Sequence, residues 1–210
     1  GLLIWGEMPS AYRFTPTSMA RLVREWTEAV DRDVSHPCVV AWVPFNESWG
    51  VPNLADSPTE VNYVKAIYHL TKSLDPSRPV IGNDGWESTI TDIVGIHDYD
   101  SDGERLGARY QAPELVPTLL KRERPGGRLL VLDANRVGEV AIVLSEFGGI
   151  ALGAMTTEQS NATWGYSTAR DPGTLMKKYR ELLHAVGSAR LLAGFCYTQF
   201  ADTYQEANGL

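Results

Sequence analysis

Cysteine, long apolar runs and clustered positive charge are all scarce in this sequence of 210 residues. Only Cys38 and Cys196 are present, which excludes a disulfide framework and a cysteine-based zinc cluster. The longest strictly apolar runs, such as Val39–Val43, are much shorter than the roughly 20 residues that cross a bilayer. The formal net charge is -7, and the basic residues form no stripe that would indicate nucleic-acid binding. We therefore expect neither a membrane nor a nucleic acid as a partner.

Aromatic residues are abundant in this acidic chain, with six Trp and nine Tyr. Aromatic rings combined with carboxylates suit a neutral, ring-shaped ligand such as a sugar. The first residues, Gly1 to Trp5, contain no initiator Met and no basic segment. We therefore expect that this sequence begins inside a longer protein. Its cellular compartment is then undetermined, with the cytoplasm favoured.

Short apolar runs alternate along the chain with segments of helical spacing. The predicted strands cover residues 2–5, 39–45, 79–82, 93–96, 141–144 and 191–197. Residues 100–140 are rich in Pro, Gly and charge, and we expect a long loop insertion there, with a possible extra strand over residues 128–133. Alternating helices and nearly continuous apolar strands predict a parallel sheet covered by helices.

Capping residues mark the predicted helix ends. Thr15 and Pro16 begin the first helix, whose apolar face carries Met19, Leu22, Val23, Trp26 and Val30. A capping box at Ser57–Glu60 begins a second helix, which ends at Asp75 and Pro76. A last helix begins at Asp171 and Pro172, and Gly187 is placed just after its end.

Polar clusters follow three of the predicted strands: Asn46-Glu47, His97-Asp98-Tyr99 and Glu146. In a parallel α/β barrel, active sites are built at the carboxyl ends of the strands. Glu47 and Glu146 each follow a buried strand, and a pair of carboxyl groups is what glycoside hydrolysis requires. Either Glu alone could be an ordinary polar loop residue. The two together, with His and Tyr at a third strand, favour an active site.

Several segments resemble family 2 of the glycoside hydrolases, which includes β-galactosidases, β-glucuronidases and β-mannosidases. Asp33–Ser48 resembles the acid/base signature of that family, and Leu144–Gly149 resembles its nucleophile strand. Gly1–Pro9 and Gly194–Asp202 are similar to its third and eighth barrel strands. The resemblance implies an α/β fold, a (β/α)8 TIM barrel of which residues 1–210 hold strands three to eight, without strands one and two and the preceding sandwich domains. Two exposed strand edges would follow, and a homo-oligomer could form through them.

The resemblance also implies a role for each residue at the strand ends. Glu47 would be the general acid/base and Glu146 the nucleophile, a pair that retaining enzymes place roughly 5 Å apart. Glu146 must be ionised, and we predict that the Tyr99 hydroxyl donates a hydrogen bond to it. Asn46 would bind the sugar 2-hydroxyl, and His97 and Tyr99 would face the ligand.

Further candidates for substrate binding follow or adjoin strand ends. Glu7 could hold a sugar hydroxyl or a bound arginine, and Trp49, Trp86 and Trp164 could stack on sugar rings. Each of these four residues could equally have a packing role. His36, His69 and His184 are expected to be structural, and the four His lack the spacing of metal ligands, so we expect no metal and no cofactor.

The substrate is the least determined property. No Asn is followed two positions later by Lys, so the motif by which β-glucuronidases bind a sugar carboxylate is absent. Neutral sugars are therefore favoured, with β-galactosides first. Thr198-Gln199 stands where the family usually has Trp-Asn, which removes an aromatic floor from the sugar site. The alternatives are a non-catalytic carbohydrate-binding domain, a fragment inactive without its sandwich domains, and an endo-acting hydrolase.

Overall fold

A computed structural model describes residues 2–132, 140–153 and 163–210. The chain divides into two compact units. Unit 1 contains Gly1–Gly95 and Gly127–Ala141, and unit 2 contains Ile96–Gly126 and Ile142–Leu210. Among the helices of the described residues, none is long and apolar enough to cross a membrane.

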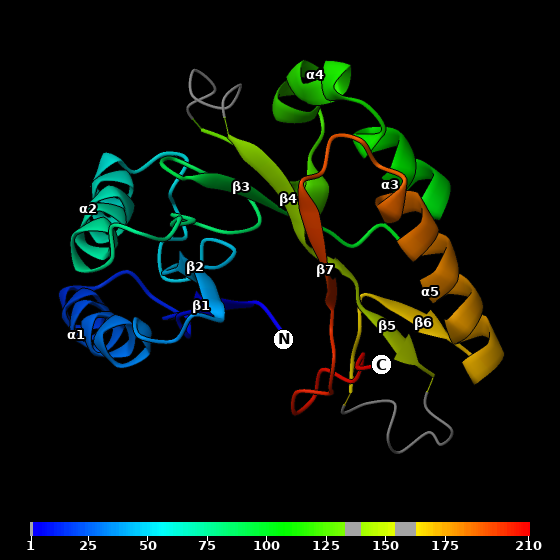
Figure 1. The fold of residues 1–210 in the computed structure, drawn as a ribbon, viewed down its shortest axis with the longest axis horizontal. Coiled ribbons are helices and arrows are strands. Elements are labelled where there is room, and N and C mark those ends of the chain that lie inside the picture. The colour runs from blue at the N-terminus through cyan, green and yellow to red at the C-terminus, as the bar shows by residue number, and fades with distance from the viewer. Residues whose placement is uncertain (1, 133–139, 154–162) are drawn as a thin grey trace. The chain divides into compact units, whose positions relative to one another are not determined.

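Unit 1 is built on two parallel strands and two long helices (Figure 1). Strand β1 (Ile4–Glu7) pairs with β2 (Val39–Val43), and helix α1 (Pro16–Asp33) connects them. Helix α2 (Pro58–Leu74) follows β2. The parallel pairing and the helical connection between the strands are as predicted, while β1 begins two residues later than expected.

The capping residue and one buried face define α1. Thr15 caps the helix as predicted, because its side chain accepts from the Ser18 backbone N–H at 3.1 Å. Leu22, Trp26 and Val30 are buried in the core of unit 1. The placement of Val23 on this face was wrong: its side chain is 37% exposed, because it follows Leu22 by about 100° around the helix.

Helix α2 has its predicted ends, with a capping box that is only half formed. The Ser57 side chain accepts from the Glu60 backbone N–H, but the Glu60 carboxylate accepts from Asn53 instead of turning back to Ser57. Asp75 caps the carboxyl end. The strand predicted over residues 79–82 is reduced to isolated bridges, such as the one between Trp42 and Val80.

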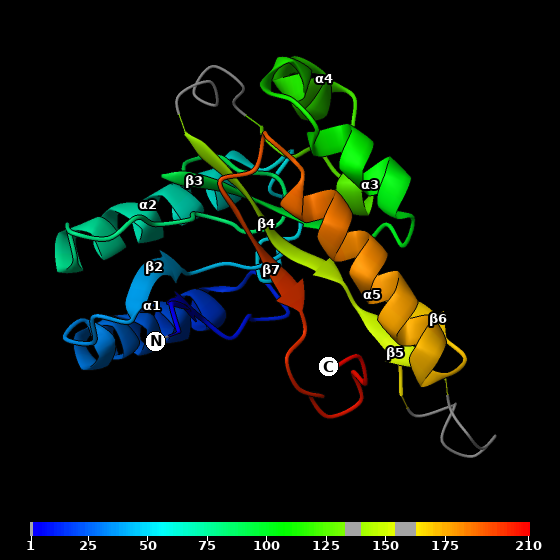
Figure 2. The same ribbon diagram turned by 45° about the vertical axis from the view of Figure 1, so that its right-hand side comes forward.

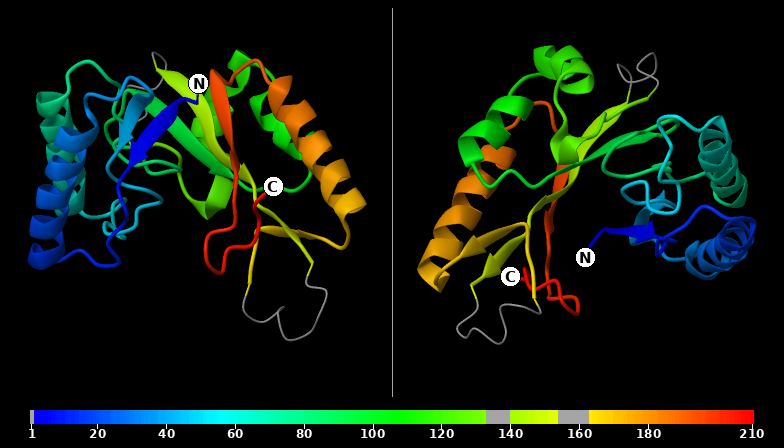
Figure 3. Two further views of the ribbon diagram at one scale, coloured as in Figure 1. Left: turned by 60° about the horizontal axis from the view of Figure 1, so that its bottom comes forward. Right: turned by 180° about the vertical axis from the view of Figure 1, so that it is seen from behind.

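Unit 2 contains most of a sheet with the strand order β3-β4-β7 (Figure 2). Strand β3 covers Ile93–Asp98, β4 covers Ala141–Gly148 and β7 covers Gly194–Thr198. The β4–β7 pair is parallel, as predicted. A second parallel pair, β5 (Ile150–Leu152) and β6 (Ser167–Ala169), was not predicted and lies beside helix α5 (Pro172–Gly187), as Figure 3 shows.

The expectation of a long loop over residues 100–140 was wrong. Helices α3 (Gly103–Tyr110) and α4 (Val116–Lys121) form there, with single 3₁₀ turns at Pro113–Leu115 and Pro125–Gly127. The predicted strand over 128–133 is only a bridge between Ser88 and Val131, and residue 133 lies outside the described residues.

Helix α3 packs against α5 in unit 2 (Figure 1). Asp171 caps α5 as predicted, by accepting from the Thr174 backbone N–H at 2.8 Å. Gly187 was predicted beyond the end of α5 and is in fact its last residue, with Ser188 at the C-cap. Gly107 of α3, which has no side chain, lies against Ala185 of α5, and these two small residues allow the helices to approach closely.

Candidate active site

The Asn46-Glu47-Ser48 turn of unit 1 begins shortly after β2 ends at Val43. Glu47 and Ser48 both have left-handed backbones, with φ angles of 53° and 58°. The Glu47 N–H donates to the Asp84 carbonyl at 3.0 Å, and the Asp84 N–H donates to the Phe45 carbonyl at 2.9 Å. Glu47 therefore lies beyond a strand end, as predicted, in a turn held by backbone bonds to the segment around Asp84.

Asn46 has a buried side-chain oxygen at this turn. Its Oδ1 atom receives no hydrogen bond from any residue that the structure describes. Buried polar atoms are usually paired, so an orphaned acceptor calls for a specific explanation. A ligand hydroxyl group is one donor that would satisfy it.

A buried network that was missed at the sequence level adjoins Glu47. Ser48 Oγ donates to Glu87 Oε2 at 2.5 Å, and Asn83 Oδ1 accepts from the Ser48 N–H at 3.0 Å. Arg128 Nη1 lies 2.9 and 3.0 Å from the two Glu87 carboxylate oxygens. Ser48 and Glu87 are 39 residues apart, so no local pattern could indicate this contact.

Glu146 of unit 2 is within β4, not directly after the strand as predicted. Its side chain is 24% exposed. Tyr99, which follows β3, donates its hydroxyl hydrogen to Glu146 Oε2, so the predicted contact is confirmed. His97 Nδ1 lies 3.5 Å from the same oxygen, and the His97 side chain is fully buried. Three of the predicted site residues thus meet in unit 2.

The protonation state of Tyr99 follows from its surroundings. Burial, and then the negative charge of Glu146, raise the pKa of the Tyr99 phenol well above its usual value of about 10. The phenol therefore stays protonated at any ordinary pH. It remains a donor to the carboxylate and carries no competing charge.

Tyr166 is the site residue that sequence reasoning missed in unit 2. Its ring stacks on Tyr99, with centroids 3.3 Å apart and planes 2° from parallel. Trp164 meets Tyr166 edge to face at 5.5 Å, and its side chain is exposed. The spacing of Trp164 and Tyr166, two residues apart, was the available signal, because alternate residues share one side of an extended segment.

The remaining predicted site residues lie in unit 1. Glu7 ends β1 and is exposed. Trp49 is 49% exposed and meets Tyr12 edge to face at 5.8 Å. Trp86 is half-buried, and its carbonyl accepts from Asn83 Nδ2 at 2.7 Å. The binding roles of these three residues therefore stay predictions.

Charged residues of unit 2 fix the backbone on both sides of Tyr99. Arg109 of α3 donates to Asp98 and to Asp100, each at 2.7 Å. The Tyr110 hydroxyl donates to Asp98 at 2.9 Å. Arg105, and to a lesser degree Arg109, outweigh partial burial and hold the pKa of Asp100 well below its usual range. Asp100 is therefore ionised at neutral pH.

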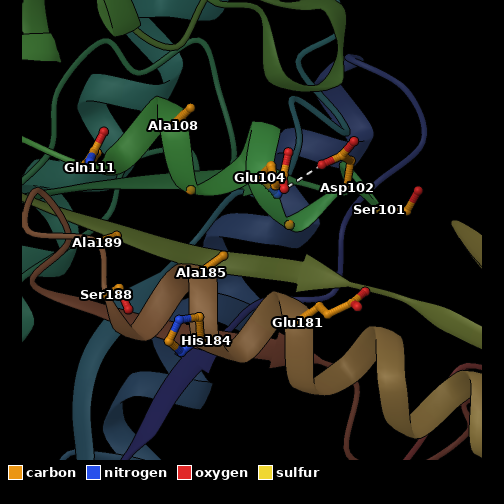
Figure 4. Close-up of a pocket in the computed structure, with 12 residues that line it drawn as sticks. Ser101, Asp102, Glu104, Ala108, Gln111, Glu181, His184, Ala185, Ser188 and Ala189 are labelled. Atoms are coloured by element: carbon orange, nitrogen blue, oxygen red, sulfur yellow. Dashed lines mark hydrogen bonds between the residues drawn. The ribbon is translucent and has the colours of Figure 1, made fainter.

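A cavity of about 830 Å³ lies between α3 and α5 (Figure 4). Its lining includes Asp102, Glu104, Glu181 and His184, and it contains none of the predicted site residues. His184 is on α5, and the backbone carbonyl of His36 accepts from Arg78, so the structural roles expected for the two side chains stay predictions.

Parallel strands joined by helices, with carboxylates at or near the carboxyl ends of the strands, place the chain in the α/β class. A family model described as "Glycosyl hydrolases family 2, TIM barrel domain" matches residues 9–114, just over half of the chain. The chain belongs to glycosyl hydrolase family 2, a family of glycosidases, and contains sequence of its TIM-barrel domain.

Two relatives of known name differ in their activity. A β-galactosidase of Klebsiella pneumoniae is 38% identical over 69 residues, which are 32% of this chain and 6% of that protein. A β-glucuronidase of Sus scrofa is 30% identical over 112 residues, 48% of this chain and 16% of that protein. The matched segments thus span less than a fifth of either relative.

Solved structures with low sequence identity support the same fold. A β-glucuronidase of Bacteroides uniformis has a TM-score of 0.66 at 15% identity, covering 100% of this chain and 26% of that one. A β-glucuronidase of an uncultured Clostridium species has a TM-score of 0.62 at 18% identity, covering 100% of this chain and 37% of that one. These likenesses confirm the predicted TIM-barrel fold class.

Proposed function

We propose that this chain supplies the catalytic residues of a retaining exo-β-glycosidase, with Glu146 as nucleophile and Glu47 as acid/base. The observation that carries the proposal is the Glu146 carboxylate, partly exposed and held by the Tyr99 hydroxyl beside His97. A hydrogen bond donated by a neutral phenol favours the ionised form of a carboxylate, which is the form that a nucleophile needs. The assignment of residues 1–210 to barrel strands three to eight is part of the same proposal.

The reaction proceeds by two displacements. The Glu146 carboxylate attacks the anomeric carbon while the bond to the aglycone oxygen breaks, and Glu47 gives its proton to that oxygen. A covalent glycosyl ester of Glu146 results, and the carboxylate charge is lost. Glu47, now ionised, takes a proton from water as the water attacks the anomeric carbon and releases Glu146.

Asn46 and the aromatic residues are proposed to bind the sugar. The orphaned Asn46 Oδ1 would accept from a sugar hydroxyl, which the resemblance identifies as the 2-hydroxyl group. Hydrogen bonds to this group strengthen as the oxocarbenium-like transition state forms. Trp164 offers an exposed aromatic face near the Tyr99–Tyr166 stack, and Trp49 offers one close in sequence to Glu47. Trp86 and Glu7 are weaker candidates for contacts to the substrate.

A carbohydrate with a terminal neutral sugar is the proposed substrate, with β-galactosides first. The absence of an Asn-x-Lys motif argues against a sugar carboxylate, which would need a cationic partner. A panel of nitrophenyl β-glycosides that includes the galactoside, glucoside, mannoside and glucuronide tests this choice. Preference for the glucuronide would contradict the neutral-sugar assignment.

Trapping of the covalent intermediate tests the catalytic assignment directly. A 2-deoxy-2-fluoro glycoside with a good leaving group slows hydrolysis of the intermediate, because the fluorine destabilises the oxocarbenium-like transition state. Incubated with the protein that carries residues 1–210, it should add one sugar to the peptide that contains Glu146. Glu146→Gln should abolish the labelling. A label on any other carboxylate would disprove the assignment.

A second candidate is carbohydrate binding without turnover. It is favoured by the exposed aromatic side chains of Tyr12 and Trp49, which form an edge-to-face pair at 5.8 Å. Calorimetric binding of a sugar to a folded protein that cleaves no glycoside in the panel would support this candidate over the enzyme.

A further inference from the structure

We propose that Glu87 is a positioning residue for Glu47 and acts through Ser48. The inference rests on the proposed acid/base role of Glu47. Glu87 itself is buried and is not placed among the reacting groups. Its effect would be to keep the Glu47 carboxyl group where it can protonate the departing oxygen.

The first step of the argument is the backbone conformation of the turn. Glu47 and Ser48 are two consecutive left-handed residues, and neither is a glycine. For residues with a Cβ atom this conformation costs free energy, because Cβ approaches the backbone carbonyl oxygen. Such a conformation persists only where the surrounding structure determines it. The turn that carries Glu47 therefore needs a contact from outside itself.

Ser48 provides that contact with both its backbone and its side chain. Its N–H donates to Asn83 Oδ1 at 3.0 Å, and its Oγ receives a bond from Asn83 Nδ2 at 3.1 Å. The Ser48 hydroxyl donates to Glu87 Oε2 at 2.5 Å. Ser48, Asn83 and Glu87 are all buried. A hydrogen bond to a carboxylate is about twice as strong as one between neutral groups, so the Glu87 contact is the strongest of the three.

The position of Glu87 is fixed from its other side. Its N–H donates to the Leu129 carbonyl at 2.7 Å, and Arg128 compensates the buried charge. The Arg128 side chain is 41% exposed, which weakens its own electrostatic contribution. Glu87 is thus a rigid anchor. Its removal leaves the strained turn supported by Asn83 and by the backbone bond from Glu47 to Asp84.

Leaving-group dependence separates positioning of an acid from general loss of structure. A misplaced Glu47 cannot protonate a departing alkoxide, but a dinitrophenolate leaves without a proton. Damage to Glu47 therefore slows glycosides with poor leaving groups selectively. Damage to the whole fold slows all substrates equally.

The experiment uses aryl and alkyl β-glycosides of graded leaving-group pKa and four variants of the protein that carries residues 1–210. Glu47→Ala defines the full loss of acid catalysis, and Ser48→Ala and Glu87→Gln each weaken the anchor. Glu28→Gln is the matched control, because Glu28 is an exposed Glu of the same unit that pairs with Arg24. General acid catalysis contributes about 10²–10⁴-fold, so we expect Ser48→Ala and Glu87→Gln to lose about tenfold or more in kcat on alkyl glycosides, and little on dinitrophenyl glycosides.

The double variant Ser48→Ala/Glu87→Gln tests whether Glu87 acts through Ser48. Residues that act as one unit are not additive, so the double variant should be no slower on alkyl glycosides than the slower single variant. If Glu87→Gln does not fold, as judged by its circular dichroism spectrum, Ser48→Ala decides, because it keeps the Glu87–Arg128 pair intact.

The outcomes separate the two proposals. A steep leaving-group dependence for Glu47→Ala, with equal losses across substrates for Ser48→Ala and Glu87→Gln, overturns the positioning role alone. A flat dependence for Glu47→Ala overturns the acid/base role, and the positioning role with it. Additive losses in the double variant overturn the action of Glu87 through Ser48.

Discussion

Tyr99 donates a hydrogen bond to Glu146 from the segment that follows the neighbouring strand β3. The phenol stays protonated because burial and the adjacent carboxylate raise its pKa, so it remains a hydrogen-bond donor to Glu146 at neutral pH. In the mechanism proposed above, the same bond is made to a charged nucleophile before attack and to a neutral ester afterwards. The bond therefore favours one orientation of the carboxylate as well as its ionised form.

Tyr99→Phe tests the importance of this bond for turnover. Loss of a single aimed donor typically costs about 10²–10³-fold in kcat, and we expect a loss of about 100-fold here. The control is Tyr204→Phe, since Tyr204 is an exposed tyrosine of the same unit. Steady-state kinetics with a nitrophenyl glycoside measures both. Unchanged turnover in Tyr99→Phe would exclude a role for the hydroxyl in catalysis.

The two proposed catalytic carboxyl groups should respond differently to substitution. Glu146→Gln should abolish turnover of every glycoside, because no other group forms the covalent ester. Glu47→Ala should retain more activity on activated aryl glycosides than on unactivated ones, since good leaving groups need little protonation. Comparison of kcat/KM for the two substrate classes measures the difference. An equal loss on both classes would contradict an acid/base role for Glu47.

Asp75 gives unit 1 a dependence on acid pH. Its side chain is buried, which alone would raise its pKa, but hydrogen bonds from Ser77, Arg78 and Trp42 hold the pKa well below its usual range. The unfolded chain has a pKa of about 3.9 at this residue, so the stabilisation is present above that pH. It is lost as the pH falls through the lower value of the folded state.

Asp75→Asn should lower the free energy of unfolding at pH 7 by about 3 kcal/mol, because the Arg78 charge loses its buried partner. The difference between Asp75→Asn and the unsubstituted protein should shrink as the pH is lowered below about 4. Urea unfolding followed by circular dichroism at several pH values measures both effects. Asp56→Asn, at an exposed position of the same unit, is the control. A constant difference at all pH values would contradict the role of the Asp75 charge.

Gly149 is required where β4 leads into β5. Its φ angle is 57°, and a Cβ at this position would clash with the Tyr166 ring that stacks on Tyr99. Gly149→Ala should cost about 1–2 kcal/mol of stability from the backbone alone, and the displaced Tyr166 should reduce turnover further. Gly127→Ala provides a control for the backbone cost, since Gly127 also has a positive φ but has open space around it. Equal effects of the two substitutions would show that the Tyr166 contact is unimportant.

Local signals were sufficient to predict the long helices and most strands. Thr15, Ser57 and Asp171 each precede a proline and cap the helix that follows, and such caps depend only on neighbouring residues. The short helix α3 was not predicted, because its eight residues include two glycines and three charged residues. The directions of its charged side chains are set by tertiary contacts, which the local sequence does not reveal.

Part of the candidate site could be predicted from residue type and from position along the strands. The proximity of Tyr99 and His97 to Glu146 could be predicted because neighbouring parallel strands bring their carboxyl-terminal parts to one edge of a sheet, although Glu146 lies within β4 and His97 within β3. The Tyr166 stack and the Ser48–Glu87 bond could not be predicted, since each joins segments far apart in the sequence. The half-formed capping box at Ser57 has the same origin, because Asn53 competes successfully for the Glu60 carboxylate.

The Arg109 guanidinium group donates hydrogen bonds to the aspartates on either side of Tyr99. The phenol is thereby tethered to a helix that supplies none of the proposed reacting groups. In the proposed mechanism, substitutions in α3 would therefore shift the Tyr99 hydroxyl without changing Glu47 or Glu146 themselves. Differences in rate between close relatives should be sought in this helix as much as in the carboxylates.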